Sequence, residues 1–185
     1  MRTHRIASRH AHWRVFVCAT VLAAIWIVSG AAQSGVDPAL LRRLFPAATA
    51  FSPKGGDPPH IRALVGDPKS GAQTPVGLAF WTTELEPLER GYDGPIKILV
   101  GIDMKGVLAG IVVTEHHEPY GNFSIDPPQF SAQFKGKDVR DRFRVGMDVD
   151  AVSRASITIG SATRAIRNSA RRIARQYLAP PEAAN

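Results

Sequence analysis

The segment IKILVGIDMKGVLAGIVVT, residues 96–114, decides the fold class. Two runs rich in β-branched residues, Ile96–Ile102 and Val107–Thr114, flank the turn Asp103–Gly106. Two such runs joined by a short turn that contains Asp and Gly predict a β-hairpin. The middle of the chain is therefore expected to form an antiparallel sheet.

Further elements are expected on both sides of this hairpin. Two strands, Ile61–Val65 and Val76–Thr82, precede it, and short helices are expected at Pro38–Leu44 and near Gln129–Phe134. From Ser161 to Leu178 apolar residues recur with the helical period while most arginines occupy the remaining surface, which predicts an amphipathic helix. The fold class expected is α+β: a small antiparallel sheet with a hairpin and a C-terminal amphipathic helix.

The 185 residues are enough for one domain with a proper core. Residues 33–60 are rich in Pro, Gly and Ala and are expected to act as a tether. Residues 61–178 are expected to form the domain, and residues 179–185 a tail.

Residues 1–32 have the pattern of an export segment. They carry arginines but no acidic residue, followed by the apolar run Val15–Val28 and the small residues Ser29–Ala32. This pattern is typical of a secretory signal cleaved after Ala32 or of a retained membrane anchor, and the sequence leaves both open. Positive charge stays cytoplasmic, so the rest of the chain is expected on the periplasmic side of the inner membrane, anchored there or free after cleavage.

The net charge of +7 is concentrated at the two ends of the chain. Residues 33–150 hold 13 basic and 15 acidic residues, whereas residues 151–185 hold six arginines and one glutamate. An arginine-rich helix could bind nucleic acid, but no aromatic residues interleave with its charges, so a solvated face or a docking face for an acidic partner or lipid headgroups is favoured. The single cysteine, Cys18, excludes a disulfide framework, Cys-ligated iron–sulfur clusters and Cys-based zinc sites.

Candidate chemistry lies in the segment Asp150–Thr158, directly before the expected C-terminal helix. Its hydroxyl and backbone N–H groups would project from a helix N-terminus, which favours an anionic group such as phosphate. Ser and Thr also gather at helix starts simply to cap them. From spacing alone, both interpretations remain open.

The same segment resembles the FMN-binding domain of membrane redox systems of the NosR, Rnf and Nqr types. The family motif runs Asp-x-x-[Ser/Thr]-Gly-Ala-[Thr/Ser]-x-[Thr/Ser], and the matching positions are Asp150, Ser153, Ala155, Ser156 and Thr158. Three upstream pieces resemble the family in the same order: Gly91–Ile96, Gly101–Gly106 and Glu115–Pro119. Within the family, the greatest similarity is to the exported flavin domain of NosR-like proteins of nitrous-oxide respiration.

The resemblance implies a flavoprotein that relays electrons rather than a stand-alone enzyme. It implies FMN attached through a phosphoester bond to Ser156, installed by a dedicated FMN transferase, and a membrane or periplasmic redox partner. The cofactor-binding residues it implies include the loop residues His117 and Glu118 and the acceptor segment (Asp150, Ser153, Arg154, Ala155, Ser156 and Thr158).

Three departures from the family are visible in the sequence. Arg154 replaces the usual Gly, which takes positive φ freely, so a different local turn is expected, although an arginine can also pair with a phosphate. Ser156 replaces the commoner Thr but supplies the same hydroxyl. The polytopic membrane section and cysteine clusters of full-length NosR-like proteins are absent, so the chain is not expected to pass electrons across a membrane alone.

Other candidates carry weaker signals. His116, His117 and Glu118 could suggest a metal site, but adjacent residues on a strand point to opposite faces and a loop beside the flavin is favoured. Thr163 is a second candidate flavin acceptor, because Gly160–Thr163 resembles part of the motif, but no Asp stands at the right distance upstream. Four aromatic residues, Trp81, Tyr92, Tyr120 and Phe123, are expected mostly to pack in the core or in loops, with stacking of one of them on the flavin ring as the alternative.

Two other functions remain open at this point. One is an accessory or sensory module of the same fold without covalent flavin, which acts through protein contacts. The other is a nucleic-acid binder, which is disfavoured because an exported protein meets little nucleic acid.

Overall fold

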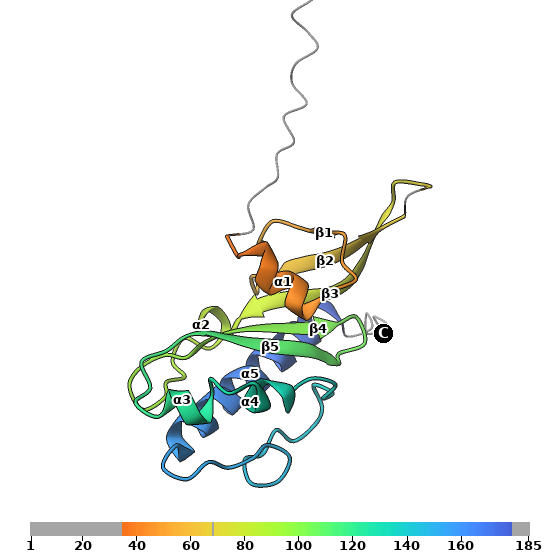
Figure 1. Ribbon diagram of the computed structural model, residues 1–185. Coiled ribbons are helices and arrows are strands. Elements are labelled where there is room, and N and C mark those ends of the chain that lie inside the picture. The colour runs from red at the N-terminus through yellow and green to blue at the C-terminus, as the bar shows by residue number, and fades with distance from the viewer. Residues whose placement is uncertain (1–34, 68, 179–185) are drawn as a thin grey trace, which may run out of the picture. The chain divides into compact units, whose positions relative to one another are not determined.

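A computed structural model describes residues 35–67 and 69–178. A five-stranded antiparallel sheet in the order β1-β2-β3-β4-β5 forms its centre (Figure 1). The strands are β1 (Ala50–Phe51), β2 (Ile61–Gly66), β3 (Gln73–Trp81), β4 (Lys97–Asp103) and β5 (Leu108–Glu115). The helices are α1 (Pro38–Leu44), α2 (Thr82–Leu85), α3 (Gly121–Ser124), α4 (Pro128–Ala132) and α5 (Ser156–Tyr177).

The predicted α+β class is confirmed. β4 and β5 pair as the expected hairpin around the turn Asp103–Gly106. Each predicted strand is present with its ends shifted by a few residues. The prediction placed Thr82 in a strand, but it begins α2, where its Oγ1 accepts a hydrogen bond from the Ile98 backbone N–H at 3.1 Å.

Both faces of the sheet are buried, because helices cover each side. Alternate residues of β4 point to opposite faces: Ile98 and Val100 pack toward α5, and Leu99 packs toward α1. All three side chains are fully buried. The continuous apolar sequence of the hairpin therefore reflects a sheet enclosed from two sides.

The segment expected to be a tether supplies one of these covering layers. α1 lies across the sheet, and its residues Leu41 and Leu44 are buried (Figure 1). Phe45 follows α1 and packs so closely on the strands that a Cβ added at Gly77 would lie 2.2 Å from its ring. Residues 36–51 are thus an integral part of the domain, since their apolar side chains complete the core on this face.

α5 begins at Ser156, five residues before the predicted start at Ser161. Its arginines do not form a freely solvated face. Arg164 pairs with Glu89 at 2.6 Å, Arg171 donates to the carbonyl oxygens of Val139 and Asp141, and Arg172 donates to that of Leu85. These three arginines attach the helix to the loops around it.

Within residues 35–67 and 69–178, no helix is both long and apolar enough to span a membrane. The expected signal or anchor, residues 1–32, and the expected tail, residues 179–185, lie outside the described residues.

Candidate functional site

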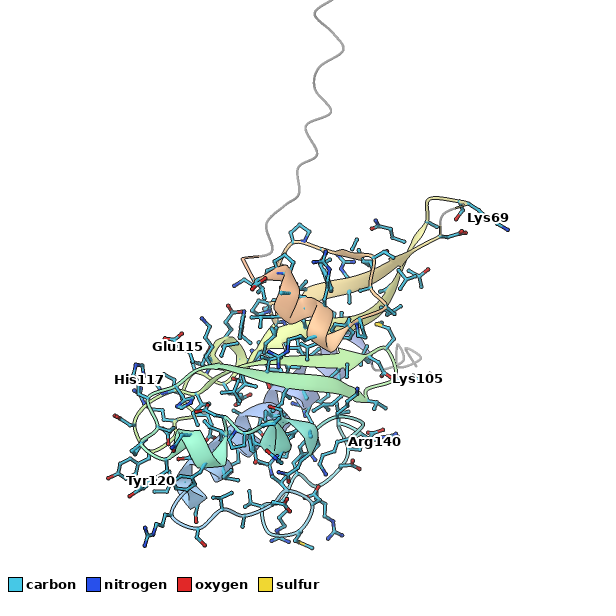
Figure 2. The ribbon with its side chains drawn as sticks, viewed as in Figure 1. Lys69, Lys105, Glu115, His117, Tyr120 and Arg140 are labelled. Atoms are coloured by element: carbon cyan, nitrogen blue, oxygen red, sulfur yellow. The ribbon has the colours of Figure 1, made fainter. Side chains whose placement is uncertain are left out.

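Three segments far apart in the sequence meet at one end of the sheet. They are the loop at residues 91–94 before β4, the chain that follows β5, and the first turn of α5. Figure 2 labels Glu115, His117 and Tyr120 at this end, opposite Lys105 in the β4–β5 turn. The topology of the hairpin therefore brings two of the three predicted upstream pieces to the acceptor segment.

Glu118 joins the three segments through its carboxylate. The backbone N–H groups of Tyr92 and Asp93 donate to it at 3.0 and 2.9 Å, and the Thr158 hydroxyl donates to it as well. The side chain is buried, with 6% of the residue exposed. Two predicted site residues, Glu118 and Thr158, are thus in direct contact although 40 positions apart in sequence.

Glu118 is ionised in this setting. Burial alone would raise the pKa of its carboxyl group, but hydrogen bonds from Thr158, Asp93 and Tyr92 act in the opposite direction. Together with the nearby His116, they hold the pKa below its ordinary value of 4.5. A buried charge is tolerated here because each hydrogen bond favours the charged form.

The loop that donates to Glu118 requires glycine at its first position. A Cβ added at Gly91 would lie 2.3 Å from Glu118 Oε1. The backbone of the loop can approach the carboxylate only because this side chain is absent. The Gly91 position thus belongs to the site through its backbone, which the motif alone did not reveal.

His116 is engaged in a separate hydrogen-bond chain. The Glu118 backbone N–H donates to His116 Nδ1 at 3.1 Å, so in the neutral ring Nε2 carries the proton and donates to Asp126 Oδ1 at 2.7 Å. His117 is exposed and lies at the periphery. Among the described residues, no group of three His, Cys, Asp or Glu side chains could hold a metal ion.

The acceptor segment ends in an open helix N-terminus. Ala155 is the N-cap of α5 and, among the described residues, no side chain caps this end, so the interpretation of the Ser and Thr residues here as caps is wrong. Ser156 is the first helical residue and is exposed, whereas Thr158 is buried. The first turn of α5 therefore presents a free hydroxyl beside backbone N–H groups with no side-chain acceptor.

Arg154 has a backbone conformation that favours glycine. Its φ is 69°, in the left-handed region that glycine adopts freely. This conformation is costly for a residue with a Cβ. The turn into α5 is therefore imposed by its surroundings, and the Arg154 side chain is exposed beside Ser156.

Residues 91–171 match the FMN-binding domain family. The predicted resemblance to an FMN-binding domain is confirmed over these residues, which hold the three upstream pieces and the acceptor segment. The matched segment begins at Gly91, which packs on Glu118, and includes every predicted site residue.

A curated relative agrees with this family match. A subunit of the ion-translocating oxidoreductase complex of Cronobacter sakazakii is 46% identical to the chain over 48 residues. The alignment covers 26% of this chain and 21% of the relative, so the chain spans about a fifth of the relative's length. The family match supports FMN as the ligand.

Exposed apolar side chains lie around the start of α5 and the Glu118 contacts. Tyr92 is 71% exposed, Ile157 57%, Phe123 45% and Tyr120 42%. The rings of Tyr120 and Phe123 lie 5.3 Å apart. Trp81, the fourth aromatic candidate, is buried in the core and is excluded as a stacking residue. The remaining aromatic residues offer apolar surface to a planar ring.

Two predicted residues have other surroundings. Asp150 is exposed, and its backbone N–H donates to Gln133 Oε1 at 2.6 Å. Thr163 is buried, with 1% exposed, so its hydroxyl is closed to a modifying enzyme. Two residues of the site were not predicted as site residues. Gly91 lets its loop approach Glu118 closely, and Asp126 is hydrogen-bonded to His116.

Proposed function

We propose that this chain is an exported, membrane-associated flavoprotein that carries FMN as a phosphoester on Ser156 and relays electrons in a NosR-like respiratory system. The observation that supports it most is the start of α5. An exposed hydroxyl stands at the first position of a 22-residue helix whose N-terminus has no side-chain cap.

The donor set at this end fits a phosphate group. Backbone N–H groups at a helix N-terminus and the helix dipole both favour an anion. Arg154 stands next to the turn and forms no hydrogen bond or ion pair with a described residue, so its guanidinium is available to a phosphate. Ser156 supplies the oxygen of the ester.

The neighbouring residues would hold the acceptor and the ring in place. Glu118 ties the first turn of α5, through Thr158, to the loop at residues 91–94. Tyr92, Tyr120 and Phe123 offer exposed aromatic surface at the same end. FMN, once attached, supplies the redox chemistry, and the protein fixes its position and its electrostatic surroundings. A covalent link is reasonable outside the cytoplasm, where a dissociated cofactor would be lost.

The test is coexpression of the full chain with an FMN transferase, followed by intact-mass measurement and flavin fluorescence in a denaturing gel. The wild type is expected to gain the mass of one FMN less one water and to fluoresce. Ser156→Ala should lose both signals, and the matched control Ser153→Ala should keep them.

An unmodified wild type, or modification that survives Ser156→Ala, contradicts the proposal. Unmodified protein that still captures a membrane partner would favour the accessory or sensory module.

A further inference from the structure

β5 is the last strand of the sheet, and only part of its outer edge is covered. At Leu108 the neighbouring segment pairs with it: the Leu108 N–H donates to Lys137 O, and the Gly136 N–H donates to Leu108 O, both at 2.8 Å. Beyond this point, no described residue pairs with the outer side of the strand. The sheet therefore has an open edge along the second half of β5.

The register shows which backbone groups face this edge. Ile98 of β4 directs its N–H toward Thr82, away from β5, and Ile98 is paired with Val113. The alternation of an antiparallel ladder then directs the N–H and C=O groups of Val113 and Ile111 away from β4. Ile111 is 5% exposed and lines the hollow described below, so little water surrounds its free backbone groups. Unpaired groups of this kind favour a hydrogen-bonding partner.

A hollow of about 430 Å³ lies along this edge. Residues 109–113 of β5 form its floor, and α1 and the α4 region line its sides. Figure 1 shows β5 between α1 and α4. An extended strand that enters the hollow would meet the free groups of Ile111 and Val113 at the spacing of a sheet.

The charged side chains around the hollow indicate which kind of peptide it would bind. Arg43 and Lys135 line it, and their side chains form no hydrogen bond or ion pair with a described residue. Asp126 also lines it, but its carboxylate is bound to His116. The two cations outnumber this one carboxylate, so the lining carries a net positive charge, which favours an acidic segment.

A second copy of the chain fits this edge poorly. Symmetric pairing of β5 with itself would bring two pairs of like charges, Arg43 and Lys135, together. Each β5 edge is also flanked by α1 and the α4 region, which narrows the approach of a second sheet. A single extended peptide meets neither obstacle.

We propose that the edge of β5 binds an extended acidic peptide segment of a partner protein as an added strand. The backbone groups of Ile111 and Val113 provide the strand pairing, and Arg43 and Lys135 provide the preference for acidic side chains. This interaction surface is separate from the flavin acceptor and does not depend on flavin attachment.

Fluorescence anisotropy of labelled hexapeptides with the full-length protein tests the proposal. A peptide of alternating Glu and Val is expected to bind at least about tenfold more tightly than one of alternating Lys and Val. N-methylation of one set of alternate residues should abolish binding, whereas N-methylation of the other set should leave it, because only one edge of a bound strand faces β5.

The double variant Arg43→Glu/Lys135→Glu should bind the acidic peptide at least about tenfold more weakly. The matched control Lys69→Glu/Lys105→Glu makes the same change in net charge at two turns that do not line the hollow (Figure 2) and should bind normally. Equal binding of acidic and basic peptides, or equal effects of both N-methylation patterns, overturns the proposal. If the wild type bound no peptide but self-associated, and the Arg43→Glu/Lys135→Glu variant did not self-associate, the edge would bind a second copy of the chain instead.

Discussion

The two longest helices of the described domain begin in opposite ways. α1 has seven residues, and its start is fully capped: Asp37 accepts a hydrogen bond from the Ala39 N–H at 2.8 Å, and Pro38 occupies the first turn. α5 has 22 residues and no side-chain cap. A short helix depends on its cap, whereas α5 is held along its length by buried side chains such as Ile159, Ile166 and Ile173. The open end of α5 is thus tolerated by the fold and available to a ligand.

The strongest way to break the start of α5 is to remove Glu118. Glu118→Ala leaves the N–H groups of Tyr92 and Asp93 and the Thr158 hydroxyl without their acceptor. We expect a loss of about 3 kcal/mol in the free energy of unfolding, measured by urea denaturation. Glu115→Ala is the control, because that side chain is 64% exposed in a 3.6 Å pair with Lys97, and it should change stability little. Equal effects of the two variants would contradict the role of Glu118.

A smaller loss of stability is expected when a side chain is added to the loop that approaches Glu118. Gly91→Ala places a Cβ 2.3 Å from Glu118 Oε1, so the loop or the carboxylate must shift. We expect a loss of about 2 kcal/mol in the same denaturation assay. Gly55→Ala is the control, because a Cβ there meets nothing within 4 Å. If Gly91→Ala were as stable as this control, the close approach would be unnecessary.

The two helix starts can be compared directly by removing hydroxyl or carboxyl groups from each. Asp37→Ala should cost about 1 kcal/mol in stability, because the cap of α1 is lost. Ser153→Ala and Ser156→Ala should each change thermal stability little, because neither side chain caps α5. A loss at Ser153 or Ser156 equal to that at Asp37 would restore the capping interpretation.

Replacement of Arg154 by glycine should raise the stability of the domain, whereas the changes above lower it or leave it unchanged. Arg154→Gly relieves a left-handed residue with φ 69°, and we expect a gain of about 0.5–1 kcal/mol in the free energy of unfolding. The same change removes the guanidinium proposed to assist the phosphate, so flavin attachment should fall while stability rises. A stability loss would show that Arg154 is held by contacts other than those described.

Acid should weaken the Glu118 contacts selectively. The pKa of Glu118 is lowered in the folded protein, so its contribution is fully present above the unfolded value and is lost as the pH falls through the folded value. Wild-type stability should therefore decline below the ordinary value of 4.5 more steeply than that of Glu118→Gln. Parallel declines in a pH series of thermal melts would contradict an ionised Glu118.

The sequence predicted the elements better than it predicted their contacts. The hairpin and α1 follow from local patterns, because alternation, turn residues and helical period are properties of neighbouring residues. α5 was predicted to begin too late, since Ser156–Gly160 has little helical periodicity and its start is set by packing against Glu118. The tether interpretation of residues 33–60 followed from composition, which does not reveal that Gly77 and Gly101 leave room for Phe45.

The site shows the same limit. The motifs selected Glu118 and Thr158 separately, but nothing in the sequence indicates that one donates to the other across 40 positions. The sequence also did not show that Arg154 adopts a left-handed φ, because arginine, unlike the glycine of the motif, rarely takes this conformation. Long-range contacts and imposed backbone geometry are the parts of the site that only the fold reveals.

The central claim is that the open start of α5 carries the flavin, and peptide mapping tests it most directly. Full-length protein coexpressed with an FMN transferase would be digested, and the FMN-bearing peptide fragmented by tandem mass spectrometry. The account predicts that the added mass lies on Ser156. Attachment to Ser153 or Thr163, or the absence of any modified peptide, would contradict it.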